Sequence, residues 1–153
     1  MDASIINPFI SAAQHVLETM ASVKARPGKI FLKKGDVAQG DVTGLIGLTG
    51  YALGSIAVTF EEACIFKIVT GMFGEPVSAL TAEVADAVGE LTNIISGQAR
   101  RELEMQGKQF QAAVPSVVTG RGHTIFHCTD GPKIGIPFET DDGNFVIEVC
   151  LSK

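Results

Sequence analysis

Residues 81–105 read TAEVADAVGELTNIISGQARRELEM, and this stretch decides the fold because it is the most regular pattern in the chain. Its apolar residues recur every three or four positions, which is the spacing of one face of an α-helix. Thr81 stands where the N-cap of such a helix is expected. Gly107 fits a C-terminal cap, so the helix is expected to end near Met105 or Gln106.

Each residue turns a helix by about 100°, so the side chains of this stretch can be assigned to faces. With Asp86 at zero, Glu90 falls at about 40° and Asn93 at about −20°. Gly97 falls at about 20°. These four residues form one narrow row, here called the polar stripe. The apolar residues gather on the opposite side: Val84, Val88, Leu91, Ile95 and Ala99. The sequence therefore predicts a helix that buries this apolar side and shows the polar stripe to water.

The rest of the chain divides into helical and β-rich segments. Helical spacing recurs over residues 5–24 and 61–73. Residues 41–48 and 53–60 flank a glycine-bearing turn, which is the pattern of a β-hairpin. After the long helix, short β-rich runs are expected at 110–118, 124–129, 134–138 and 145–151. We therefore expect one α+β domain over residues 1–153, in which helices cover a largely antiparallel sheet.

The composition excludes several classes of protein. The chain has 153 residues, of which 46% are hydrophobic and 19% charged, so disorder is not expected. Its net charge is −5 and its basic residues form no cluster, which argues against nucleic acid as a partner. It has neither an apolar run of about 18 residues nor a secretory signal, so neither membrane insertion nor export is expected. Three widely spaced cysteines fit reduced thiols in a cytoplasmic protein.

The polar stripe carries side chains that suit the handling of a phosphoryl group. The Asn93 carboxamide can both donate and accept hydrogen bonds without titrating, so it can hold a water in line with phosphorus. Glu90, one turn away, suits a salt bridge to a lysine of a partner. Gly97 in mid-helix costs about 1 kcal/mol relative to alanine, which fits the close approach of another backbone. The spacing alone also fits an ordinary solvated helix face.

The residues around the stripe help to decide between a phosphoryl-handling site and an ordinary solvated helix face. Asp86 to Arg100 reads DAVGELTNIISGQAR, and Pro115 follows 22 positions beyond Asn93. This combination resembles the signature of the CheC/CheX/FliY family of chemotaxis phosphatases, which is an Asp or Ser, then Glu, then Asn, with a proline in the following segment. Four further segments look like the CheX branch: 7–9, 26–34, 40–47 and 110–115. The resemblance spans nearly the whole chain.

The resemblance implies a phosphatase that acts on a CheY-type receiver domain phosphorylated on aspartate. It implies that Glu90 pairs with a lysine of the receiver and that Asn93 enters the receiver's site to orient the attacking water. Asp86 matches the first motif position, and we expect Asp86 and Gly97 to contact the partner. Mg²⁺ belongs to the receiver, so no cofactor or metal is expected on this chain. CheC-like members carry two such helices, whereas this chain has a single Glu-x-x-Asn. In this respect the chain resembles CheX, and the resemblance to CheX implies a homodimer.

Other interpretations remain open at the level of the sequence. The same stripe would serve a non-catalytic receiver-binding adaptor or a flagellar switch module. A small-molecule phosphatase would need a nucleophile motif such as Asp-x-Asp or Cys-x5-Arg, and the chain has neither. His123 and His127, four apart in an expected strand, would share one face, but no third metal ligand stands near them in the sequence.

Overall fold

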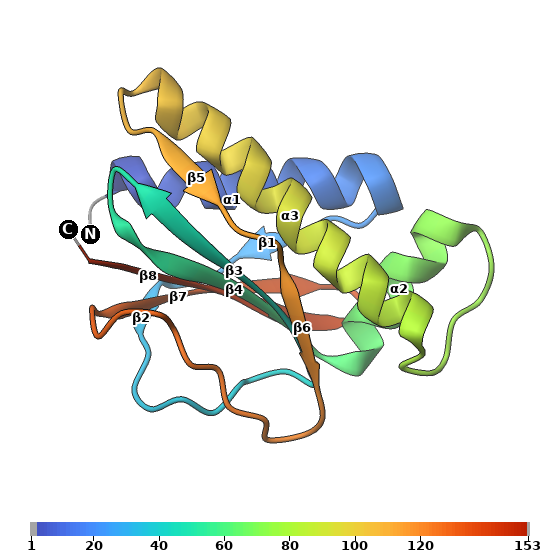
Figure 1. Cartoon of the computed structure of the whole chain (residues 1–153). Helices are drawn as coiled ribbons and strands as arrows, with labels where there is room; N and C mark the ends of the chain where they lie inside the picture. The colour runs from blue at the N-terminus through green and yellow to red at the C-terminus, as the bar shows by residue number, and fades with distance from the viewer. Residues whose placement is uncertain (1–2, 153) are drawn as a thin grey trace.

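The computed structural model describes residues 3–152, whose strands join into one sheet with helices packed on one side (Figure 1). Residues 1, 2 and 153, the ends of the expected domain, lie outside the described residues. The helices are α1 (Ala3–Ala21), α2 (Glu62–Phe73) and α3 (Ala82–Met105). The strands are β1 (Arg26–Pro27), β2 (Phe31–Leu32), β3 (Val42–Gly50), β4 (Leu53–Phe60), β5 (Phe110–Ala112), β6 (Ser116–Thr119), β7 (Lys133–Thr140) and β8 (Gly143–Ser152).

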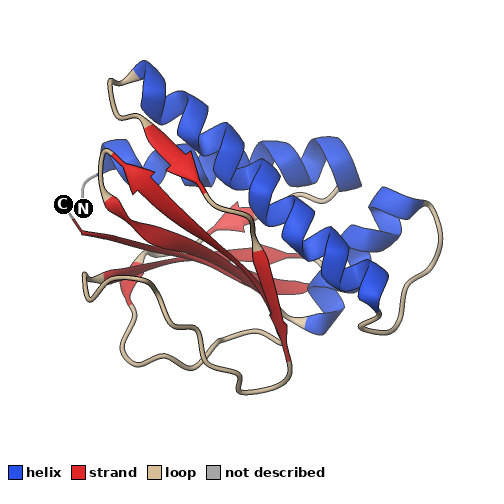
Figure 2. Ribbon diagram, in the orientation of Figure 1, coloured by secondary structure: helices blue, strands red, loops and turns tan. Residues whose placement is uncertain are grey.

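All strand pairings in the described chain are antiparallel. The strand order is β1-β7-β8-β4-β3-β5, with β2 also pairing with β7 and β6 with β3. Figure 2 shows α1 and α3 along one face of the sheet and long loops below the other. The α+β architecture expected from the sequence is therefore confirmed. None of the helices within residues 3–152 is long and apolar enough to cross a membrane.

Helix α3 begins and ends where the sequence predicts. The Thr81 hydroxyl accepts a hydrogen bond from the Val84 amide over 3.3 Å, which satisfies one of the free donors at the helix N-terminus. After the helix, Gly107 adopts a left-handed conformation (φ +81°), and the Lys108 amide donates to the Leu103 carbonyl over 2.9 Å. Both ends are thus fixed, which sets the direction of every side chain between them.

The apolar side of α3 lies in the main core, where the helix packs against α1 and β3. Its fully buried residues include Val88, Leu91, Ile95 and Ala99. Gly44 on β3 allows a close approach, because a Cβ there would lie 1.9 Å from the Thr92 hydroxyl oxygen. Asn93 follows Thr92 directly in the helix, so this contact with β3 sets the position of Asn93 above the sheet.

Two loops, residues 33–41 and 120–132, cover the sheet face opposite α1 and α3 (Figure 1). Ala38 and Ile125 of these loops pack together with Ala57 of β4. Beside them lies a buried polar cluster centred on Glu148 of β8, which pairs with Lys33 over 2.5 Å and with His127 over 2.9 Å.

The prediction of a strand at residues 124–129 is wrong. This segment makes only an isolated bridge, between Val37 and Thr124. Hydrogen bonds to side chains, rather than a backbone ladder, hold it to the sheet: His127 Nδ1 lies 2.6 Å from the Ser55 hydroxyl and Nε2 lies 2.9 Å from Glu148, and the Cys128 backbone amide donates to Ser55 over 3.3 Å. A segment that lies across a sheet face has no neighbouring strand in the sheet plane with which to pair.

The run expected as one strand at 110–118 is two short strands, β5 and β6, which pair with different parts of β3. Residues 113–115 separate them. Pro115 has no backbone N–H to donate to a ladder, which explains an interruption at this point. Ala113 still donates its backbone amide to the Gly47 carbonyl of β3 over 3.0 Å, so the chain leaves the sheet edge at residues 114–115, beside α3.

Candidate functional site

The polar stripe lies where the sequence places it, with one difference. Asp86, Glu90 and Asn93 are exposed on α3, whereas Gly97 is half-buried. Within residues 3–152, no hydrogen bond or ion pair engages the side chains of Asp86, Glu90 and Asn93. These three side chains are therefore available to a partner, and the rigid helix holds them in a fixed order.

Pro115 lies beside the stripe although it is distant in the sequence. A shallow hollow of about 250 Å³ opens between α3 and the β5–β6 connection, and its lining is Ala85, Asp86, Gly89, Glu90, Pro115 and Val117. Gly89 belongs to the contact with β6, since a Cβ there would lie 3.3 Å from Val117 Cγ2. The hollow thus joins the carboxylates of Asp86 and Glu90 to the proline that follows the motif.

Gly97 differs from Gly89 in what surrounds it. A Cβ at Gly97 would meet only the end of the Arg100 side chain, at the ordinary contact distance of 3.6 Å from Nη2. No part of the described chain therefore requires a glycine at position 97. The expectation that Gly97 contacts a partner stays a prediction, and the open space above its backbone is compatible with it.

His123 and His127 do not face a common point. His123 Nε2 lies 2.6 Å from the Thr43 hydroxyl and its Nδ1 lies 2.6 Å from the Gly120 carbonyl. His127 is engaged by Ser55 and Glu148, as described above. In the part of the chain that is described, no three His, Cys, Asp or Glu side chains gather to hold a metal ion. Both histidines instead anchor the 120–132 loop to the sheet.

The polar cluster around Glu148 was missed by sequence reasoning. Lys33, Ser55 and Glu148 are all buried, and 115 residues separate the two members of the ion pair. A buried lysine facing a buried glutamate has no local sequence signal, because only the sheet topology brings the two residues together. The cluster is closed to solvent and lies on the sheet face away from α3, so we assign it to stability rather than to the site.

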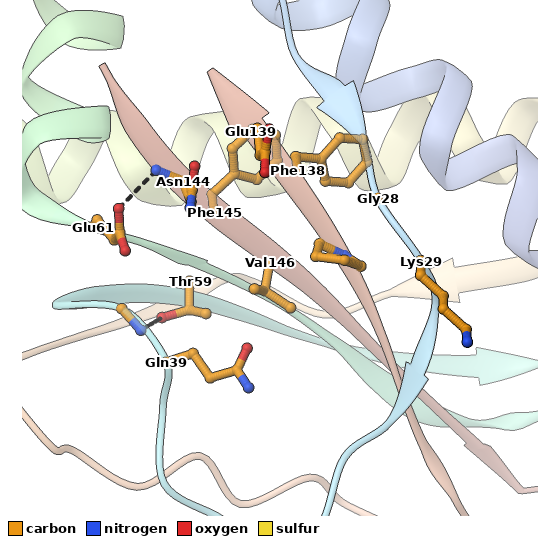
Figure 3. A pocket seen from close by; sticks show the side chains of 12 residues that line it. Gly28, Lys29, Gln39, Thr59, Glu61, Phe138, Glu139, Asn144, Phe145 and Val146 are labelled. Carbon is orange, nitrogen blue, oxygen red and sulfur yellow. Dashed lines mark hydrogen bonds between the residues drawn. The ribbon is translucent and has the colours of Figure 1, made fainter. Parts of the chain in front are cut away.

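A second hollow, of about 370 Å³, lies on the same loop-covered side of the sheet (Figure 3). Its lining includes Thr59, Glu61 and Asn144. The backbone amide of Asn144 donates to the Glu61 carboxylate over 2.8 Å, and the backbone amide of Gly40 donates to the Thr59 hydroxyl over 3.2 Å. The side chains of Thr59 and Glu61 already have partners inside the chain. We therefore place the candidate site at the polar stripe and not at this hollow.

Comparison with known proteins agrees with this choice. The family model described as "Chemotaxis phosphatase CheX" matches residues 42–139, a range that contains the whole polar stripe and Pro115. The chain belongs to the CheX family. Among CheX relatives, the CheY-P phosphatase CheX of Thermotoga maritima is 30% identical over 122 residues, which cover 79% of each protein.

Solved CheX structures share the fold over nearly the full length. The chemotaxis protein CheX from Vibrio vulnificus has a TM-score of 0.91 and 44% identity, covering 98% of this chain and 100% of that one. CheX in the CheX–CheY–BeF₃–Mg²⁺ complex from Borrelia burgdorferi has a TM-score of 0.81 and 25% identity, covering 97% of both chains. The resemblance to the CheX branch seen in the sequence is thus confirmed.

Proposed function

We propose that this CheX-family chain hydrolyses the aspartyl-phosphate of a CheY-type receiver domain. The observation that carries the proposal is the exposed Asn93 amide, which stands beside Glu90 on a rigid helix and has no partner within the described residues. Two relatives support it, since one is named a CheY-P phosphatase and another was solved in complex with CheY. A receiver in the cytoplasm is the substrate class that this proposal implies.

Asn93 performs the central step in this mechanism. The side-chain carbonyl of Asn93 accepts a hydrogen bond from the attacking water, and its NH₂ group can donate a second hydrogen bond. These bonds hold the water in line with phosphorus. Water attacks phosphorus, the bond between phosphorus and the aspartyl oxygen breaks, and the receiver's aspartate and inorganic phosphate are released with one proton. Mg²⁺ bound by the receiver stabilises the charge on the phosphoryl oxygens. The proposed mechanism requires no metal or cofactor on this chain.

The other residues of the stripe orient the two proteins. Glu90 is proposed to pair with a lysine of the receiver, which fixes the angle at which α3 docks. Asp86 lies one turn before Glu90 and lines the same hollow, so it is placed at the edge of the interface. Gly97 lies one turn after Asn93 and leaves its backbone accessible for close approach.

The phosphatase activity can be tested with a phosphorylated CheY-type receiver and Mg²⁺. We predict that the wild-type chain accelerates phosphate release. Asn93→Ala should lose most of that acceleration, on the order of 100-fold, because the water loses the group that positions it. Receiver binding by this variant should persist. Gln109→Ala is the matched control, since it removes an exposed amide from the loop after α3.

Two outcomes would contradict the proposal in different ways. If Asn93→Ala keeps full activity, the mechanism is wrong. If the wild-type chain binds the receiver without changing the rate of phosphate release, the chain is a binding adaptor instead.

Homodimer formation, which the sequence resemblance to CheX led us to expect, is also proposed here. The sheet has open edges at β1 and at the β5–β6 side, and unpaired edge strands can join a second copy. Light scattering of the purified chain should give twice its monomer mass, and a single-chain mass would exclude the dimer.

A further inference from the structure

Arg100 lies on the same side of α3 as the polar stripe. It follows Asn93 by seven residues, which places it at about −40° on the same wheel, and two turns or about 10.5 Å further along the axis. The residue is half-buried. Arg100 therefore extends the stripe towards the C-terminal end of the helix.

The Arg100 side chain folds back towards Asn93. Its Nε donates to the Ser96 hydroxyl over 3.3 Å, and its Nη2 lies 3.6 Å from the point that a Cβ of Gly97 would occupy. The guanidinium thus lies at the level of Gly97, only about 6 Å along the axis from Asn93. The missing side chain at Gly97 leaves the guanidinium beside an open backbone.

Among the residues that the structure describes, no anion compensates the charge of Arg100. None of the ion pairs among residues 3–152 includes it, and Ser96 is the partner that the described residues provide. Burial lowers the pKa of the guanidinium below its ordinary value, which shows that the group is partly desolvated without an opposing anion. Both terminal amino groups remain able to donate to an oxyanion in a fork geometry.

Between Asp86 and Arg100, the charges on this side of α3 are ordered around Asn93. The carboxylates of Asp86 and Glu90 lie on its N-terminal side and the Arg100 guanidinium lies on its C-terminal side. A partner with the opposite order of charges fits this surface in one direction only. The rim of a Mg²⁺-dependent phosphoryl site supplies anions, since Mg²⁺ is held by carboxylates and by the phosphoryl oxygens.

We propose that Arg100 is a further docking residue, which pairs with an oxyanion at the rim of the receiver's phosphoryl site. The oxyanion is either a receiver carboxylate or an oxygen of the phosphoryl group. The inference rests on the proposed function, because it takes a phosphorylated receiver as the partner. In the proposed complex, Glu90 and Arg100 bind the receiver on opposite sides of Asn93. Together they fix where the Asn93 amide enters the receiver's phosphoryl site.

The test measures binding of the full chain to one CheY-type receiver in two forms, unmodified with Mg²⁺ and loaded with BeF₃ and Mg²⁺. Arg100→Gln should weaken binding about tenfold, the loss typical of one charged hydrogen bond. Arg100→Lys should recover part of the loss because it restores the charge. Arg121→Gln makes the same change of charge in the loop layer on the other face of the sheet, and should bind like wild type.

The pattern of loss identifies the oxyanion. Equal weakening towards both receiver forms assigns it to a carboxylate, and weakening confined to the BeF₃-loaded form assigns it to the phosphoryl group. If Arg100→Gln binds both forms like Arg121→Gln, the inference is wrong. It is also wrong if the Gln and Lys variants lose binding equally and both unfold at lower temperature, since the role is then structural.

Phosphate release separates this inference from the proposed function. If the wild-type chain fails to accelerate release, or if release does not depend on Asn93, the proposed function fails. If both hold and only the Arg100→Gln result is negative, the docking role of Arg100 alone is rejected.

Discussion

At position 97 the chain carries a glycine where alanine would favour the helix. We predict that Gly97→Ala raises the free energy of unfolding by up to about 1 kcal/mol, because the new methyl meets only the end of Arg100 at 3.6 Å. The same methyl would stand between Asn93 and Arg100 and should raise the KM for the phosphorylated receiver. Thermal unfolding and steady-state phosphate release measure the two effects. A variant that gains stability and keeps its KM would contradict a docking role for Gly97.

At this scale, helical geometry predicted most of the candidate site. The wheel placed Asp86, Glu90 and Asn93 on an exposed face because a regular helix fixes side-chain direction locally. It also placed Gly97 in water, whereas the residue is half-buried beside the folded-back Arg100 side chain. That rotamer depends on a hydrogen bond to Ser96 and on neighbours that a wheel does not show. The roles of these residues in the reaction stay predictions.

At the scale of elements, the position of the site depends on how closely α3 approaches β3. A Cβ at Gly44 would lie 1.9 Å from the Thr92 hydroxyl oxygen and 2.8 Å from Thr92 Cβ. We predict that Gly44→Ala forces α3 away from the sheet, lowers the free energy of unfolding by about 1–3 kcal/mol, and reduces phosphate release by moving Asn93. Denaturant unfolding and activity at low temperature measure the two losses.

Thr92→Ala in the same background tests the cause. It removes the hydroxyl but keeps the Cβ, so it should recover part of both losses, and a double-mutant cycle should show coupling between positions 44 and 92. Strictly additive effects would show that Gly44 acts on β3 itself and not through α3.

Elements with strong local signals were predicted and those held by distant contacts were not. The caps of α3 and the β3–β4 hairpin follow from short-range patterns at Thr81, at Gly107 and around Gly50. Segment 124–129 has the composition of a strand, yet His127 ties it across the sheet face. Such a tie depends on where β4 and β8 present Ser55 and Glu148, which the sequence of the segment itself does not contain.

Over the whole molecule, the two faces of the sheet have separate roles, one in the proposed reaction and the other in stability. The helix face carries the apolar core and the polar stripe, whereas the loop face is held by Glu148 through Lys33 and His127. Breaking the loop face should therefore lower stability more than it alters the chemistry at Asn93. The two roles can be separated by measuring unfolding and phosphate release on the same variants.

The contribution of Glu148 to the stability of the loop face can be tested by its dependence on pH. Burial favours the neutral carboxyl, but the hydrogen bonds from His127 and Lys33 outweigh burial and hold the pKa of Glu148 below its ordinary value. The unfolded chain therefore binds a proton at Glu148 more readily than the folded chain does. The stability contributed by this carboxylate is present above the unfolded pKa of about 4.3 and is lost as the pH falls through it towards the folded pKa.

We therefore predict that wild-type stability falls as the pH drops below about 5, and that Glu148→Gln removes part of this fall while lowering stability at neutral pH. The neutral-pH loss should be about 3–5 kcal/mol, because Lys33 is left buried without its anion. Thermal unfolding between pH 7 and pH 4 measures both effects, with exposed Glu139→Gln as the control. Replacing the pair with Lys33→Met and Glu148→Leu should recover part of the loss, since two apolar side chains need no counter-charge, although His127 still loses its partner Glu148. A Glu148→Gln chain as stable as wild type at pH 7 would show that the buried ion pair does not hold the loop layer.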